Sequence, residues 1–211
     1  MGRGKTMYKK VKRMLDVILA VIMLVCASPL LLLVALIIKL ESKGPALFKQ
    51  DRRGLKGEPF KIYKFRSMTV GAEQQGTGVY SFKDDPRVTK VGKFIRKTSI
   101  DELPQLINII KGEMSFIGPR PVLTYHPWGL EEYTEEQMKR FDVLPGVTGL
   151  AQLNGRKELE WPERIKLDVK YVETLSFGLD VKLFFQTIKK VLLMQDNYNV
   201  SHTSNNNTMD M

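Results

Sequence analysis

The sequence has only one cysteine and two histidines among its 211 residues. Cys26 therefore has no partner for a disulfide within the chain. These three residues also fall short of the four cysteine or histidine ligands that a structural zinc site usually takes. The fold must depend on a hydrophobic core, and the length suits one domain with one such core.

Acidic residues are in deficit. Lysine and arginine total 33 against 23 aspartates and glutamates, which gives a formal net charge of +10. This balance favours anionic partners, namely nucleic acid, anionic lipid or phosphorylated substrates. Charge alone does not choose among the three, so the choice depends on the motifs.

Charged residues are absent from Val17 to Ile38. A helix of about 22 apolar residues is enough to cross a hydrocarbon core of roughly 30 Å. The run is longer than the hydrophobic region of a usual secretory signal peptide, which argues against that alternative. The sequence therefore predicts a membrane helix near the N-terminus.

Ser28 and Pro29 lie in the middle of this run. Proline removes a backbone donor, so a kink or break is expected there. Both flanks of the run are basic, so the positive-inside rule does not orient a spanning helix. A re-entrant hairpin broken at Ser28-Pro29 would keep both flanks on one side of the membrane. A kinked spanning helix is the alternative, and the pattern leaves both open.

The rest of the chain predicts a mainly helical fold with a small β element. Alternating apolar and basic residues at 59–66 predict a short strand, and residues 91–112 predict an interrupted helix. The other expected segments are a polar connection at 41–53, a mobile loop at 71–86, a rigid turn at 118–121, a short helix at 131–140, a structured loop at 144–156, helices at 161–174 and 179–194, and a disordered tail from 196.

The last predicted helix has apolar residues on one face and lysines off it. Such a helix either lies in a membrane interface or packs on a core, and the upstream membrane segment favours the interface. The apolar face comprises Val181, Phe184, Phe185, Ile188, Val191 and Leu192.

Asp101 and Glu102 are adjacent acids at the start of a predicted helix. Ser99 and Glu102 have the spacing of a capping box, and acids there complement the helix dipole, so the pattern alone favours a structural role. The functional alternative is a carboxylate nucleophile beside a phosphate site, where magnesium and arginines neutralise the charge.

Basic residues are placed to serve such a site. Arg120 stands between two prolines, which limits the entropy lost in presenting its guanidinium to a phosphate. Each cation alone resembles an ordinary surface residue, but together around one acidic pair they indicate a diphosphate site. The candidates are Lys64, Arg66, Arg96, Arg120 and Arg156.

These residues fall in motifs that resemble the small monotopic phosphoglycosyl transferases, bacterial sugar transferases that begin glycan assembly on a polyprenyl carrier. The resemblance runs from about Tyr8 to Leu193, nearly the whole chain. Its motifs are Lys12-Arg13-Met14-Leu15-Asp16, Ser28-Pro29, FKIYKFRSM at 60–68, DELPQL at 101–106, KGEMSFIGPRP at 111–121 and PGVTGLAQLNGR at 145–156.

The resemblance implies a magnesium-dependent, two-step transfer of a sugar-1-phosphate from a UDP-sugar to undecaprenyl phosphate. Asp101 would hold the metal, attack the sugar-bearing phosphate and expel UMP, and Glu102 would assist as a base or in the metal site. The five basic candidates would bind the substrate. Arg66 stands where some members carry lysine, which leaves its hydrogen-bond geometry open.

The resemblance also implies a protein of the bacterial cytoplasmic membrane, inserted from the cytosolic face. We expect a membrane segment at 1–43, a transferase domain at 44–195 and a disordered tail at 196–211. The expected partners are a UDP-sugar, undecaprenyl phosphate and anionic lipid headgroups, with no nucleic acid, and a homodimer is left open. The rival hypotheses are a non-catalytic, basic, membrane-anchored adaptor and a tethered nucleic-acid binder.

Overall fold

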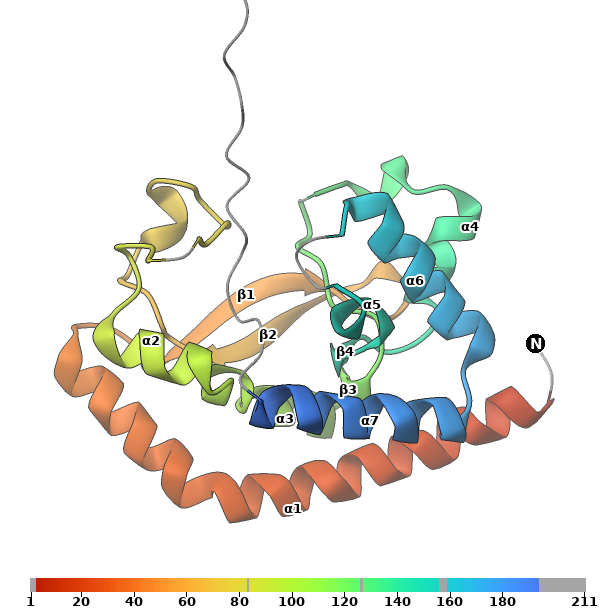
Figure 1. Cartoon of the computed structure of the whole chain (residues 1–211), viewed down its shortest axis with the longest axis horizontal. Coiled ribbons are helices and arrows are strands. Elements are labelled where there is room, and N and C mark those ends of the chain that lie inside the picture. Colours follow the sequence, from red (N-terminus) through yellow and green to blue (C-terminus); the bar gives the residue numbers. More distant parts are fainter. Residues whose placement is uncertain (1–2, 83, 126, 156–158, 194–211) are drawn as a thin grey trace, which may run out of the picture.

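The computed structural model describes residues 3–82, 84–125, 127–155 and 159–193. The architecture is mainly helical with two small sheets, as the sequence predicts (Figure 1). The tail expected from residue 196 lies outside the described residues. The helices are α1 (Arg3–Glu41), α2 (Lys90–Lys97), α3 (Gln105–Lys111), α4 (Glu135–Met138), α5 (Leu150–Leu153), α6 (Trp161–Thr174) and α7 (Phe177–Leu192), and the strands are β1 (Leu47–Arg53), β2 (Pro59–Phe65), β3 (Ser115–Ile117) and β4 (Gly146–Thr148).

α1 is one helix of 39 residues that continues through Pro29. The prediction of a helix break at Ser28-Pro29 is therefore wrong. The helix instead bends, so that its two ends turn toward the rest of the protein (Figure 1). Proline removes one hydrogen bond of the helix without ending it. The Ser28 hydroxyl donates to the Val25 carbonyl at 2.8 Å, so this polar group is satisfied within the helix itself.

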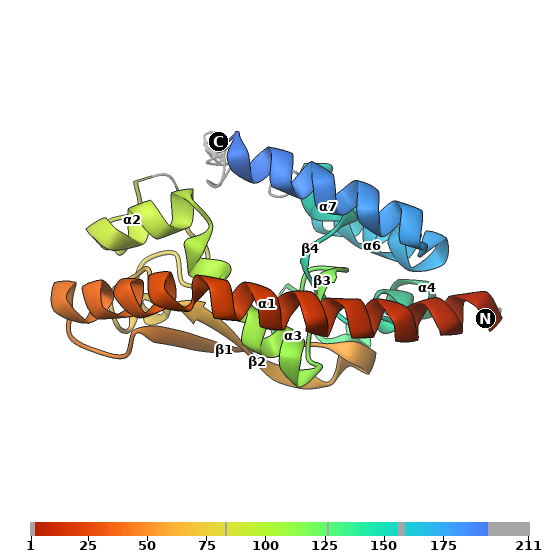
Figure 2. The ribbon, with the colours of Figure 1, turned by 90° about the horizontal axis from the view of Figure 1, so that it is seen from below.

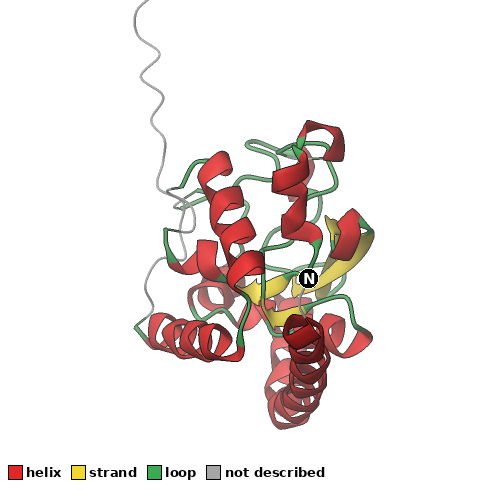
Figure 3. Ribbon diagram, turned by 90° about the vertical axis from the view of Figure 1, so that its right-hand side faces the viewer, coloured by secondary structure: helices red, strands yellow, loops and turns green. Residues whose placement is uncertain are grey.

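α1 and α7 expose apolar surface on neighbouring sides of the molecule. Thr6–Glu41 of α1 is long and apolar enough to cross a membrane, and only 11% of its apolar window is buried. Figure 3 shows α1 at the lower edge of the body formed by the other elements, and Figure 2 shows that α7 comes nearest to α1 at the N-terminal end of α7. Leu183 of α7 is in the core, whereas Phe185 and Leu192 are 64% and 75% exposed. This exposure favours the membrane-interface interpretation of α7.

Buried charges join α1 to α7. Lys12 Nζ lies 2.9 Å from Asp180 Oδ2, and the Tyr171 hydroxyl donates to Asp180 Oδ1 at 2.8 Å. Asp16, one turn after Lys12, accepts a hydrogen bond of 2.7 Å from Ser115 at the start of β3. Buried carboxylates are costly unless they are paired and hydrogen-bonded. These contacts therefore fix α1 and α7 relative to each other and explain the charges in the first motif.

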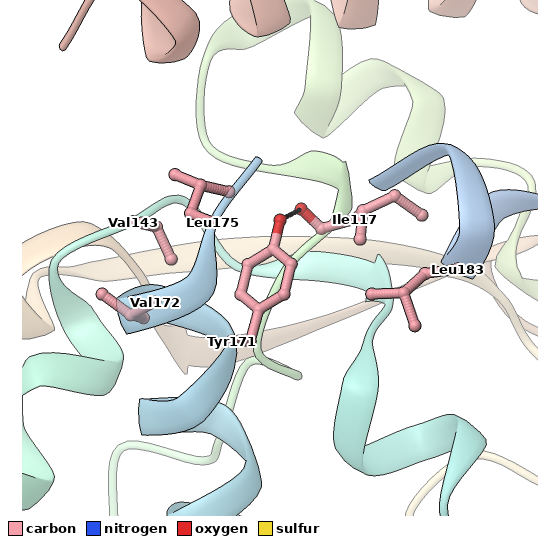
Figure 4. Packing of buried hydrophobic residues seen from close by; sticks show 6 residues of the cluster. All are labelled: Ile117, Val143, Tyr171, Val172, Leu175 and Leu183. Carbon is pink, nitrogen blue, oxygen red and sulfur yellow. Dashed lines mark hydrogen bonds between the residues drawn. The ribbon is translucent and has the colours of Figure 1, made fainter. Parts of the chain in front are cut away.

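One core cluster lies between α6, α7 and β3. Tyr171 is 1% exposed and its hydroxyl also donates to the Ile117 carbonyl at 3.1 Å (Figure 4). Because β3 leads directly into the turn at 118–121, this core fixes the start of that turn. The cluster consists of Ile117, Val143, Tyr171, Val172, Leu175 and Leu183.

A second expectation, of a polar connection at 41–53, is wrong for residues 47–53. These residues form β1, which pairs with β2 as an antiparallel hairpin in which Phe48 lies opposite Lys64. Its residues do not alternate between apolar and polar, so the strand depends on its partner and not on its own pattern. The expected helix at 131–140 is also shorter, since α4 has four residues between two 3₁₀ turns.

Candidate active site

The acidic pair lies in a 3₁₀ turn, Ile100–Glu102, between α2 and α3. Ser99 precedes this turn in the left-handed conformation, with φ of 59°, and its side chain makes no capping hydrogen bond. α3 begins after Pro104, which also provides no side-chain cap. The predicted capping box is therefore wrong, and helix capping does not account for Asp101 and Glu102.

Glu102 binds two cations from different parts of the fold. Its Oε1 lies 2.7 Å from Lys64 Nζ, near the end of β2, and 2.8 Å from Arg120 Nη2, in the turn after β3. Burial alone would raise the pKa of Glu102, but Arg120 and Lys64 hold that pKa well below its usual range. Glu102 is therefore a fixed negative charge that organises both cations.

Asp101 has the opposite shift. Burial, with the adjacent charge of Glu102, raises the pKa of Asp101 to about 6 against the opposing charges of Lys64, Arg96 and Arg120. Two neighbouring carboxyls whose pKa values move apart are typical of a site in which they have different roles. A carboxylate withdrawn from water and surrounded by cations is suited to attack an anionic phosphate.

Close backbone packing positions Arg120. A Cβ on Gly118 would lie 2.4 Å from a facing backbone oxygen, and a Cβ on Gly146 would lie 2.1 Å from the Gly118 nitrogen, so only glycine fits at either position. The Arg120 carbonyl accepts from Arg140 Nη2 at 3.2 Å. Arg140 is itself held by a buried ion pair with Asp168 at 2.7 Å. The guanidinium of Arg120 is thus presented from a rigid support.

Arg96 also belongs to this site. It lies at the end of α2, donates to Ser81 Oγ at 2.8 Å, and its charge acts on Asp101. The structure therefore brings Lys64, Arg96 and Arg120 together around the acidic pair. Arg156, the remaining candidate of the loop at 144–156, lies outside the described residues.

Arg66 is placed elsewhere. Its guanidinium donates to the carbonyls of Ser42 and Lys43 at 2.9 and 2.7 Å, just beyond the end of α1. The strand expected at 59–66 ends one residue earlier, at Phe65, so Arg66 lies just beyond the strand that carries Lys64. A buried guanidinium that satisfies carbonyls after a helix end stabilises that end, which gives Arg66 a structural role.

Two further arginines border the site, and the sequence analysis did not select them for it. Arg52 on β1 donates to the Pro121 carbonyl at 3.1 Å, directly beside Arg120. Burial and the charge of Arg120 lower the pKa of Arg52 to about 10, and the same two causes lower the pKa of Arg164 in α6. Positive charge thus exceeds negative charge around the acidic pair, which favours an anionic ligand. Arg52 lies on β1, and the sequence pattern did not predict this strand, so it gave no reason to place Arg52 beside the site.

The donor set fits magnesium better than zinc. The described residues contain no group of three or more His, Cys, Asp or Glu side chains that could hold a metal. Magnesium is usually bound by one or two carboxylates and completed by waters and substrate phosphates. Asp101 is suited to this role, because Glu102 Oε1 already accepts from two cations.

Known proteins resemble this chain over most of its length. An uncharacterized sugar transferase of Bacillus subtilis (strain 168) is 43% identical over 193 residues, which cover 92% of this chain and 93% of that protein. A UDP-glucose:undecaprenyl-phosphate glucose-1-phosphate transferase of Klebsiella pneumoniae is 44% identical over 192 residues, which cover 89% of this chain but 41% of that protein.

A third relative is the UDP-N-acetylgalactosamine-undecaprenyl-phosphate N-acetylgalactosaminephosphotransferase of Aeromonas hydrophila. It is 44% identical over 188 residues, which cover 88% of this chain and 44% of that protein. The chain thus spans less than half of the Klebsiella and Aeromonas proteins and nearly all of the Bacillus protein. Residues 7–194 also match the family described as bacterial sugar transferase. The chain belongs to the bacterial sugar transferase family.

Proposed function

We propose that the chain transfers a sugar-1-phosphate from a UDP-sugar to undecaprenyl phosphate, giving undecaprenyl-diphosphate-sugar and UMP. This would be the first membrane step of exopolysaccharide, capsule or glycoprotein glycan assembly. The observation that carries the proposal is the acidic pair of Asp101 and Glu102, set among Lys64, Arg96 and Arg120. The names of the Klebsiella and Aeromonas relatives support the same class of reaction with different sugars.

In the first step, a carboxylate oxygen of Asp101 bonds to the phosphorus that carries the sugar. The bond from that phosphorus to the bridging oxygen of the diphosphate breaks, and UMP leaves with the bonding electrons. Arg120 and Lys64 would bind the phosphate oxygens through charge-assisted hydrogen bonds. Covalent catalysis of this kind divides one difficult transfer into two easier steps.

In the second step, a phosphate oxygen of the polyprenyl acceptor attacks the same phosphorus, and the bond to Asp101 breaks. This releases the product and restores the Asp101 carboxylate. Because Glu102 already holds Lys64 and Arg120 at 2.7 and 2.8 Å, we assign it the positioning of these cations. A magnesium ion bound with Asp101 and the diphosphate would neutralise charge on the phosphates.

The direct test is UMP release by detergent-solubilised protein. The protein is given magnesium and undecaprenyl phosphate with each of a panel of UDP-sugars, and UMP is measured. We expect release with at least one UDP-sugar. A complete absence of release across the panel would favour the adaptor or nucleic-acid hypotheses instead.

We further propose that α1 enters the bacterial cytoplasmic membrane from the cytosolic face and returns to it. The bend of α1 supports this, because both of its ends turn toward the side where the other elements lie (Figure 1). The basic residues on both flanks of the apolar run would then remain in the cytosol with the active site. The exposed apolar residues of α7 would lie in the interface, near anionic headgroups.

Replacing Pro29 by alanine should change this topology. The new N–H would restore a helix hydrogen bond and favour a straight helix by about 3 kcal/mol. Cysteines introduced at Lys5 and Lys43, with Cys26 replaced by serine, are labelled in intact cells with an impermeant maleimide. We expect both sites to be protected in the Pro29 background and one of them to be partly labelled after Pro29→Ala.

The matched control is Pro162→Ala, because Pro162 lies in the first turn of α6, where no helix hydrogen bond is lost. This variant should keep both cysteines protected. Labelling of only one site in the unaltered Pro29 background would contradict the re-entrant topology.

A further inference from the structure

The segment 71–82, here called the donor loop, has almost no hydrophobic core of its own. Ala72 is 5% exposed, but Tyr80 and Phe82 are 59% and 40% exposed. Its glycines at 71, 76 and 78 all have positive φ, a conformation that glycine adopts at little cost but that does not hold a loop in place. The loop therefore needs another source of order.

Arg87 supplies that order from just outside the loop. It is 7% exposed, and its guanidinium donates through Nε, Nη1 and Nη2. Asp85, which is 1% exposed, accepts from Nε at 3.0 Å and pairs with Nη2 at 2.7 Å. The loop acceptors are the carbonyls of Ala72, Gln75 and Gly78, each at 2.7 Å, the carbonyl of Tyr80 at 2.5 Å, and Thr77 Oγ1 at 2.9 Å.

One arginine thus replaces a hydrophobic core for the donor loop. A guanidinium has five N–H donors in a fixed planar fork, which suits several converging carbonyls. Carbonyls gathered in this way would be left unsatisfied if the fork were removed, and buried unsatisfied groups are costly. Composition predicts a mobile loop at 71–86 but does not predict that Arg87 would bind several of its carbonyls.

Two contacts extend from the donor loop to the active site. Gln50 on β1 donates to Glu73 and accepts from Arg52 Nε at 2.9 Å. Arg52 in turn donates to the carbonyl of Pro121, the residue after Arg120. On the other side, Ser81 accepts from Arg96 at 2.8 Å. The position of the loop is thereby transmitted to Arg52 and Arg96.

We propose that Arg87 is a positioning residue for the nucleotide-sugar half of the reaction. It does not touch the substrate; it holds the donor loop so that Glu73 and Ser81 orient Arg52 and Arg96 toward an anionic diphosphate. The loop lies on the side of the molecule away from α1 and α7 (Figure 1), where a soluble substrate approaches. This inference rests on the proposed function for the identity of the ligand.

The test uses the ping-pong kinetics that the proposed function requires. In such kinetics, kcat/KM for each substrate reports only its own half-reaction. Arg87→Lys keeps the charge beside Asp85 but offers one nitrogen where the arginine offers three. We expect kcat/KM for the UDP-sugar to fall about tenfold, with kcat/KM for undecaprenyl phosphate unchanged. A loss of folded protein would lower both equally.

Hydrogen exchange of the full chain in detergent provides a readout without turnover. Backbone amides at 71–82 should exchange faster in Arg87→Lys, and exchange in α3 and α6 should not change. Thr77→Val, which removes a single acceptor of Arg87, is a milder variant that should change both readouts in the same direction. The matched control is Arg53→Lys, because Arg53 also donates to two carbonyls, those of Gly57 and Thr124, away from the donor loop. This control should leave exchange at 71–82 and the ratio of the two kcat/KM values unchanged.

Equal losses in both half-reactions while exchange in α3 and α6 stays unchanged, which excludes loss of folded protein, would overturn the role of Arg87. Unchanged exchange at 71–82 would overturn it as well. Absence of UMP release by the unaltered protein would defeat the proposed function instead, and the exchange measurement would still test the hold of Arg87 on the loop. The two failures are therefore distinguishable.

Discussion

Replacing Asp101 by asparagine should reduce UMP release to background, a loss of about 10³-fold or more, while expression and membrane insertion stay normal. The amide has nearly the same shape as the carboxylate but is a very poor nucleophile toward phosphorus. Helix capping offers no alternative explanation for a loss, because asparagine caps as well as aspartate. The 3₁₀ turn at Ile100–Glu102 has no side-chain cap in any case.

The covalent step makes a second demand on Asp101. Unaltered protein given a UDP-sugar and magnesium, without undecaprenyl phosphate, should release up to about one UMP per active site and gain the mass of a phosphosugar. Peptide mass spectrometry should place that mass on the peptide that contains Asp101, and Asp101→Asn should lack it.

Asp51→Asn is the matched control for this substitution. Asp51 lies on β1 and forms an exposed ion pair with Lys61 at 3.0 Å, so this variant loses a carboxylate that lies outside the acidic pair. Its activity should stay within about twofold of the unaltered protein, because surface ion pairs contribute little. An adduct on another peptide, or turnover that requires both substrates bound at once, would exclude Asp101 as the nucleophile.

Replacing Arg120 by alanine should lower activity by about 10²- to 10³-fold, the usual effect of removing one preorganised donor from a developing charge. Among the residues that the structure describes, this variant leaves Lys64 as the cation that pairs with Glu102, so the acidic pair itself is disturbed. Arg120→Lys should recover only part of the activity, because an ammonium does not reproduce a planar bidentate fork. Initial rates of UMP release measure both variants.

Lys61→Ala is the control for Arg120. It removes one positive charge from β2, the strand that carries Lys64, but from an exposed ion pair outside the acidic pair. It should leave the rate nearly unchanged. Equal rates for arginine and lysine at position 120 would show that the planar fork is not used.

Periodicity predicted the long helices well and the β hairpin poorly. The helix expected at 161–174 coincides with α6, and that expected at 179–194 begins two residues later than α7. β1 was missed because its order comes from pairing with β2, which a local pattern does not contain. The bend of α1 follows from Pro29, but whether the helix continues through the bend depends on packing and not on the proline alone.

Motifs found the acidic pair, but tertiary contacts decide which cations serve it. Lys64, Arg96 and Arg120 come from β2, α2 and the turn after β3, and their meeting at Asp101 and Glu102 is a property of the whole fold. Arg66 is only two residues from Lys64, yet it binds carbonyls beyond α1. β2 ends at Phe65, so Arg66 lies outside the strand that carries Lys64 and contacts a different part of the fold.

The contact between α1 and α7 has a consequence for biosynthesis. Asp180 follows Lys12 by more than 160 residues in the sequence, and the ribosome adds about 5–20 residues per second. α1 therefore exists for roughly ten to thirty seconds before the carboxylate that lies 2.9 Å from Lys12 has been made. A nascent chain released before that point would carry α1 without the carboxylate that pairs with the half-buried Lys12.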